Sequence, residues 1–231
     1  SPYDAAKWFQ IDDEAIPAVV NELALYTFNN TLASTGGTLG TLLKTTASYV
    51  SGRFGNAISF AKGNTASETS YSYGDIWTAM TRSNFTAGSV SIWFSPSQIN
   101  ARNIILYNEK TPYLGVELDP NNQLYTGDGT DNQIFSGTTF NANDVVFVCL
   151  TAERTGGTGN TQTCTSTMYF GVAGGTLGSV TGSGTAASSV TNTVSCFGHG
   201  ASSVGFGGWI DQTRFYDGVL TASQVQALYV E

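Results

Sequence analysis

Charged residues are scarce in this sequence of 231 residues, at 11%, and basic residues are the scarcest. Only 9 Lys and Arg stand against 17 Asp and Glu, which gives a formal net charge of −8. An ordinary soluble domain carries about 25% charged residues. Binding to a nucleic-acid backbone requires a clustered basic face, which this composition does not supply. No run of about 18 apolar residues is present either. We therefore expect neither nucleic-acid binding nor membrane insertion.

Cysteine is also rare. Cys149, Cys164 and Cys196 lack the C-x-x-C spacing of a metal site, and an odd number argues against a complete disulfide framework. Cys149 and Cys164 flank Gly156-Gly157 symmetrically. A hairpin at these glycines would leave two alternatives open, a cross-strand disulfide or two buried free thiols.

Small polar residues and glycine, of which there are 27, supply the polarity that charge does not. From Leu23 onward, short alternating or apolar runs are separated by turn residues, a pattern that predicts strands. Because no long helical pattern separates them, we predict an all-β fold, a sandwich of two antiparallel sheets. The Gly-, Ser- and Thr-rich stretches 35–46 and 174–193 are expected to be exposed loops or edge strands. The clearest predicted strands are 23–28, 57–60, 89–94, 103–107, 113–118, 123–125, 145–151, 165–170, 194–197 and 209–216.

The two ends of the chain differ from this pattern. Residues 1–20 hold the acidic run 12–14 and two prolines, and we predict an N-terminal arm followed by one domain over residues 21–231. Trp8 and Phe9 either strap the arm to the sandwich or bind a neighbouring subunit.

The C-terminus carries a helix-start signal. Thr221 is an N-cap, Gln224 completes a capping box, and Leu220 and Val225 occupy the positions of a hydrophobic staple. The pattern predicts a short helix from Ala222 to about Tyr229.

Four stretches of the sequence form an ordered set of motifs, and the last is the most specific because its residues have unrelated roles at fixed offsets. They are LALYTF (23–28), GRFGNAISF (52–60), FTAGSVSIWF (85–94), and GWIDQTRFY (208–216) with LTASQVQALY (220–229). In this order they resemble the laminin-G-like, concanavalin A-like jelly-roll superfamily. Val145-Val146-Phe147 stands where Trp and His are common in that family, and Gly171 lacks the preceding Asp. The resemblance implies a jelly roll that binds glycans or proteins outside the cell, sometimes with calcium, and sometimes acts as a glycosidase.

Catalysis is not expected. Glycosidases of this fold carry E-x-D-x-x-E on one strand, whereas Glu117 to Asn122 places an amide at the last position, and Pro120 interrupts the strand. The stretch therefore predicts a strand that runs into an Asp-Pro-Asn-Asn turn. His199 is the single histidine, no G-x-S-x-G motif exists, and we expect His199 to face solvent in a turn.

Other acidic residues receive structural interpretations. Asp211 lies in the predicted closing strand beside Ile210, so it should point to the opposite face, where it accepts hydrogen bonds from a loop or pairs with Arg214. Asp128 and Asp131 could contribute oxygens to calcium, but Asp-Gly dipeptides mark turns more often than metal sites. We predict no metal and no cofactor.

Aromatic residues point to a ligand. A sugar offers apolar C–H faces and hydroxyls, and a platform of aromatic rings beside polar groups suits both. The alternative for such a loop is that its aromatic rings fold over the sandwich edge. The densest cluster, and the predicted binding site, is Tyr71, Tyr73, Asp75 and Trp77; Tyr107, Tyr113 and Tyr125 are further candidates.

We therefore predict a non-catalytic, extracellular recognition or adhesion module whose partner is a glycan or cell-surface ligand. The alternative is a structural protein of a phage or virus particle, located on the virion surface and attached to neighbouring subunits through residues 1–20. Fold alone does not choose between these uses.

Overall fold

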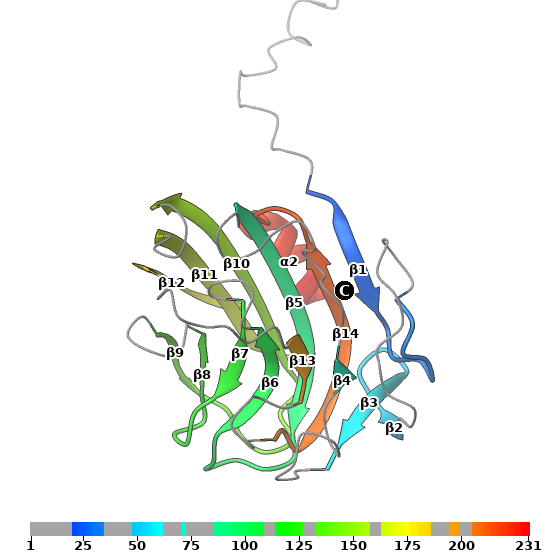
Figure 1. Ribbon diagram of the computed structural model, residues 1–231. Coiled ribbons are helices and arrows are strands. Elements are labelled where there is room, and N and C mark those ends of the chain that lie inside the picture. Colours follow the sequence, from blue (N-terminus) through cyan, green and yellow to red (C-terminus); the bar gives the residue numbers. More distant parts are fainter. Residues whose placement is uncertain are drawn as a thin grey trace, which may run out of the picture.

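The computed structural model describes residues 20–34, 48–61, 71–72, 86–108, 114–126, 133–157, 163–185, 195–198 and 205–231. These ranges form two antiparallel sheets packed face to face, with a helix on the outer side of the larger sheet (Figure 1). The predicted fold class, a jelly-roll sandwich with a short C-terminal helix, is confirmed. The predicted arm lies, except for Val20, outside the described residues.

The larger sheet has the strand order β12-β11-β10-β5-β14-β3-β2, and β1 also pairs with β14. One of its inner strands, β14, is bordered on one side by β5. On the other side β3 pairs with its first residues and β1 with its last. The strands are β1 (Glu22–Tyr26), β2 (Ser48–Ser51), β3 (Asn56–Phe60), β5 (Ala87–Pro96), β10 (Val146–Gly156), β11 (Thr163–Val172), β12 (Gly178–Thr185) and β14 (Gly208–Tyr216).

The smaller sheet has the order β4-β13-β6-β7-β8-β9. Each of the ten predicted strands overlaps a strand of the structure, whereas β2, β4, β9 and β12 were not among them. β12 does fall in the stretch 174–193, expected to be loop or edge strand, and it is an edge strand. The strands are β4 (Tyr71–Ser72), β6 (Asn103–Asn108), β7 (Val116–Leu118), β8 (Gln123–Thr126), β9 (Ile134–Thr139) and β13 (Ser195–Phe197).

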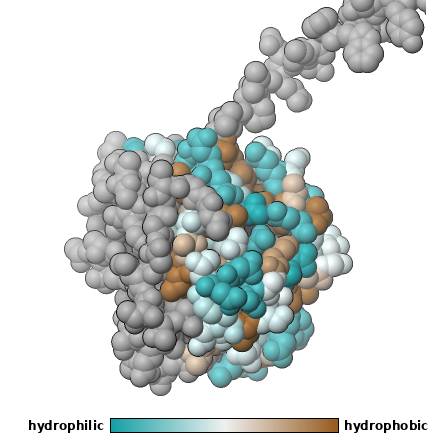
Figure 2. Space-filling view, turned by 90° about the vertical axis from the view of Figure 1, so that its right-hand side faces the viewer, coloured by the Kyte–Doolittle hydropathy of each residue, from teal (hydrophilic) through white to brown (hydrophobic). Residues whose placement is uncertain are grey.

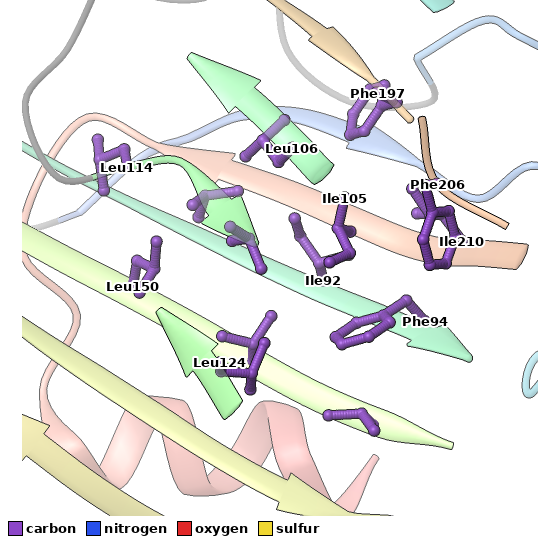
Figure 3. Packing of buried hydrophobic residues seen from close by; sticks show 14 of the residues in the cluster. Ile92, Phe94, Ile105, Leu106, Leu114, Leu124, Leu150, Phe197, Phe206 and Ile210 are labelled. Carbon is purple, nitrogen blue, oxygen red and sulfur yellow. The ribbon is translucent and has the colours of Figure 1, made fainter. Parts of the chain in front are cut away.

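The main core fills the space between the sheets (Figure 3). In most strands alternate residues point into it, because successive side chains of a strand face opposite sides. β6 differs, since its pairing with β7 is irregular between Ile104 and Leu106, and the consecutive residues Ile105 and Leu106 both belong to the core. The larger sheet contributes Ile92, Phe94, Leu150 and Ile210, and the smaller sheet contributes Ile105, Leu106, Leu124 and Phe197; all are completely buried.

A second core lies between the larger sheet and the helix α2 (Ala222–Val230). The Trp93 and Tyr229 rings stack with centroids 5.9 Å apart, and the Tyr229 hydroxyl donates to the carbonyl of Val172 at 2.5 Å. The predicted capping box at Thr221 and Gln224 is present. In the described part of the chain, no helix has the length and apolar character needed to cross a membrane.

Asp211 connects β14 to the turn between β2 and β3. It points away from the main core, as predicted, but is completely buried. Its carboxylate accepts hydrogen bonds from the amides of Phe54 (2.9 Å) and Gln212 (2.8 Å). The loop alternative was therefore right. Pairing with Arg214 was wrong, because that guanidinium binds Glu22 at 3.7 Å and Glu231 at 2.8 Å.

Cys149 and Cys164 are both buried free thiols, so the disulfide alternative is wrong. β10 and β11 do form a hairpin, but Cys149 lies opposite Tyr169, and Cys164 lies opposite Arg154. Cys149 belongs to the core under α2 and Cys164 to the core between the sheets. The two side chains thus lie on opposite faces of one sheet.

The edge formed by β1, β2 and β3 has a largely hydrophilic surface. Figure 2 shows this side, where the coloured hydrophobic residues are scattered among hydrophilic ones. The exposed residue Asn29 connects two parts of it: the Asn29 side chain accepts from the Asn56 amide (2.8 Å) and donates to the Phe54 carbonyl (3.4 Å).

Candidate functional site

The outer face of the smaller sheet carries four side chains in one line across β6, β7, β8 and β9. The strand register pairs Ile104 with Glu117, Glu117 with Tyr125, and Tyr125 with Phe135. Their sequence neighbours in the main core are Ile105, Leu118, Leu124 and Ile134, so these four face the other way. We call Ile104, Glu117, Tyr125 and Phe135 the cross-strand row.

One end of the cross-strand row is open to solvent. Ile104 is completely buried and Tyr125 nearly so, whereas Phe135, on the edge strand β9, is 40% exposed. Adjacent strands lie about 4.8 Å apart, so the row is on the order of 15 Å long. A ligand on this face would reach the β8–β9 end first.

The polar centre of the site is an ion pair. The Arg102 Nε donates to Glu117 Oε2 at 2.6 Å, and the Tyr125 hydroxyl donates to the same oxygen. The Arg102 side chain is 40% exposed and that of Glu117 is 14% exposed. The other carboxylate oxygen, Oε1, has no protein partner among the described residues. Arg102 and Glu117 thus present both donor and acceptor capacity beside the aromatic rings.

The aromatic part of the site is the Tyr125–Phe135 pair. The rings stack with their centroids 5.5 Å apart and their planes 27° from parallel. Offset stacking of this kind holds both rings in one orientation. The exposed Phe135 ring therefore has a fixed direction, which suits a surface for an apolar ligand face.

Electrostatic effects within the site agree with this geometry. The hydrogen bond to Glu117 is the largest cause that raises the pKa of Arg102, ahead of the opposing effect of burial. Burial, and then the charge of Glu117, raise the pKa of Tyr125 well above its usual range. At neutral pH the guanidinium is therefore charged and the phenol is neutral, so both can donate.

Asp119, the second acid of the Glu117 to Asn122 motif considered for glycoside hydrolysis, has a structural role. β7 ends at Leu118, and Asp119 accepts hydrogen bonds from the amides of Asn121 (2.9 Å) and Gln123 (2.8 Å). Asn122 has a positive φ of 65°. The predicted Asp-Pro-Asn-Asn turn is confirmed, and it uses the Asp119 carboxylate to close the link from β7 to β8.

The predicted site residues fall largely outside the described ranges. Tyr71 starts β4, which pairs with β13 at the edge of the smaller sheet. Tyr73, Asp75 and Trp77 lie outside the described residues, as do the calcium candidates Asp128 and Asp131, His199 and Tyr113. Among the residues described, no group of three or more His, Cys, Asp or Glu could hold a metal ion.

The sequence suggests Tyr125 as a sugar platform and Glu117 as an acid, but it does not predict that the two lie together. No sequence motif singles out Arg102 or Phe135. The available signal was the alternation of apolar and polar residues in 116–118 and 123–125, which places Glu117 and Tyr125 on outer faces.

Comparison with known proteins identifies the family. The profile of the concanavalin A-like lectin/glucanases superfamily matches residues 59–226. The chain belongs to this superfamily. Among curated proteins the sequence finds no match.

Solved structures of low sequence identity share the fold. Domain 4 of AbnA, an extracellular GH43 arabinanase from Geobacillus stearothermophilus in complex with arabinotriose, superposes with a TM-score of 0.62 at 20% identity, over 91% of this chain and 98% of that chain. The binding domain of Paraclostridial Mosquitocidal Protein 1 has a TM-score of 0.57 at 16% identity, over 90% and 52%. The binding domain of botulinum neurotoxin serotype D/C has a TM-score of 0.54 at 12% identity, over 90% and 51%. The chain thus spans about half of each toxin binding-domain chain.

Proposed function

We propose that this protein is a carbohydrate-binding module that does not cleave its ligand, and that the cross-strand row with Arg102 is its binding face. The observation that carries the proposal is the stacked Tyr125–Phe135 pair beside the Arg102–Glu117 ion pair. An exposed ring can cover the C–H face of a sugar, while a guanidinium and a carboxylate exchange hydrogen bonds with its hydroxyls. The similar arabinanase domain was crystallised with arabinotriose, which supports this class of ligand.

A binding role rather than catalysis is supported by the carboxylates. Retaining hydrolysis needs two carboxyl groups about 5 to 5.5 Å apart with separate roles. Glu117 is held by Arg102 and Tyr125, and Asp119 is held by backbone amides of its turn. Neither has the environment of a general acid.

Two finer features belong to the same proposal. We place the protein outside the cell, as the expected site of glycan recognition, and we propose that Tyr71, Tyr73, Asp75 and Trp77 extend the binding face, since β4 belongs to the same sheet as the row. The alternative role in a virus particle rests on the arm of residues 1–20, and no contact of the described residues favours it.

The test is binding of the full chain to a glycan array, followed by calorimetry with the best ligand. Phe135→Ala and Tyr125→Ala should weaken binding at least about tenfold, equivalent to about 1.4 kcal/mol. Val50→Ala is the matched control, because Val50 is 39% exposed, close to the 40% of Phe135, but lies on the other sheet. Trp77→Ala tests the extension. Wild-type affinity in both Phe135→Ala and Tyr125→Ala would refute the assignment of this face.

A further inference from the structure

The cross-strand row has a charge balance that bears on its ligand. Among the described residues of the row and their contacts, Arg102 is the one basic side chain and Glu117 is the one acidic side chain. Arg102 Nε lies 2.6 Å from Glu117 Oε2. At this separation the two charges form a charge-assisted hydrogen bond. To a ligand on the surface, the pair presents almost no net charge.

An acidic sugar would gain little at such a site. Its carboxylate would approach the exposed part of Arg102 but would also come close to the carboxylate of Glu117, and like charges at short range repel. The net charge of −8 of the whole chain adds to this repulsion. The acidic group would therefore lose its hydration without a full counter-charge in return.

A neutral sugar meets no such penalty. Its hydroxyls can donate to the Oε1 atom of Glu117 and accept from the outer nitrogens of Arg102, since a guanidinium carries five N–H donors and only one is used by the 2.6 Å contact. Its C–H face can lie on the Phe135 ring, which is 40% exposed.

We propose, resting on the proposed function, that the row selects neutral over acidic glycans, and that Glu117 is the specificity-determining residue because it neutralises Arg102. Removal of the Glu117 charge leaves the guanidinium as an uncompensated cation within the binding face. Removal of the Arg102 charge leaves the carboxylate alone and has the opposite effect.

The experiment measures affinity for two probes, the neutral oligosaccharide that binds best on the array and its counterpart with C6 carboxylates. Wild type should bind the neutral probe at least about tenfold more tightly. Glu117→Gln keeps an oxygen that can accept from Tyr125, and it should shift the affinity ratio toward the acidic probe by about tenfold or more. This shift should shrink at high salt. Arg102→Gln should move the ratio the other way.

Glu153→Gln is the matched control, because it changes the net charge by the same amount at an exposed position on β10 of the other sheet. Its ratio should equal that of wild type. Preference of the wild type for the acidic probe, or an unchanged ratio in both Glu117→Gln and Arg102→Gln, overturns the selectivity while glycan binding stands. Failure of the wild type to bind either probe overturns the proposed function as well. If Glu117→Gln does not fold, Arg102→Gln alone decides the outcome.

Discussion

Replacement of Asp211 by alanine should destabilise the protein far more than its position in a strand suggests. The carboxylate is completely buried and accepts hydrogen bonds from the amides of Phe54 (2.9 Å) and Gln212 (2.8 Å). The turn packs tightly against it, since a Cβ added at Gly52 would lie 2.7 Å from Oδ2. Alanine leaves both donors without their acceptor, and each buried unsatisfied donor costs about 1 to 3 kcal/mol.

We expect Asp211→Ala to lower the free energy of unfolding by about 2 to 4 kcal/mol, which is in the lower part of the range obtained by adding the costs of the two donors. The reason is that burial raises the pKa of Asp211 against the lowering effect of the backbone donors, so the charged side chain also carries a desolvation cost. For a chain of this length, that loss lowers Tm by about 5 to 15 °C.

Urea denaturation monitored by circular dichroism measures the loss as a lower midpoint at constant slope. Asp217→Ala is the matched control: Asp217 also accepts two hydrogen bonds, from the backbone (2.8 Å) and side chain (2.9 Å) of Asn21, but at an exposed site. It should cost less than about 1 kcal/mol. Equal costs for the two variants would show that the buried carboxylate does not hold the β2–β3 turn.

Two further predictions concern ionisable groups. Burial raises the pKa of Asp211 above 3.8 and that of Glu22 above 4.5. The folded state therefore holds more protons than the unfolded state between the ordinary and the raised values, and these groups lower stability as pH rises through that window. As pH rises through this window, the urea midpoint should decrease less for Asp211→Asn than for wild type. Identical pH profiles of the two midpoints would contradict this. Cys149 and Cys164 are buried, and burial raises the pKa of the Cys149 thiol. In a Cys196→Ser background, a thiol reagent should label neither before unfolding and both afterwards; prompt native labelling would contradict it.

Much of the fold could be predicted because strong local patterns coincide with buried elements. The run 89–94 lies within β5, which is almost completely buried, and the capping box at Thr221 starts α2 as predicted. The sequences of β2 and β12 predict strands less clearly. In β2 only Tyr49 is half-buried and the other residues are exposed, and β12 is a Gly, Ser and Thr strand in which Val180 packs against the core. Such edge strands are specified by their neighbours more than by their own apolar residues.

The register in which strands pair could not be predicted from the sequence. The hairpin of β10 and β11 was expected from Gly156-Gly157, but the actual pairing sets Gly156 opposite Thr163. The turn is therefore centred beyond the glycine pair. This offset separates Cys149 from Cys164, because a shift in pairing changes every cross-strand neighbour.

Because the strand register could not be predicted, the candidate site could be predicted only in part. Glu117, Tyr125 and Phe135 come from three strands, and only the strand pairing brings them into one line. That pairing is held by residues on the opposite face: Leu118 and Leu124, nearly or completely buried, form the adjacent cross-strand pair in the main core. A slip by one residue would turn Tyr125 into the core and Leu124 to the surface. The burial of apolar residues between the sheets therefore selects the one register that also aligns the proposed binding face, so the geometry of that face depends on the core beneath it.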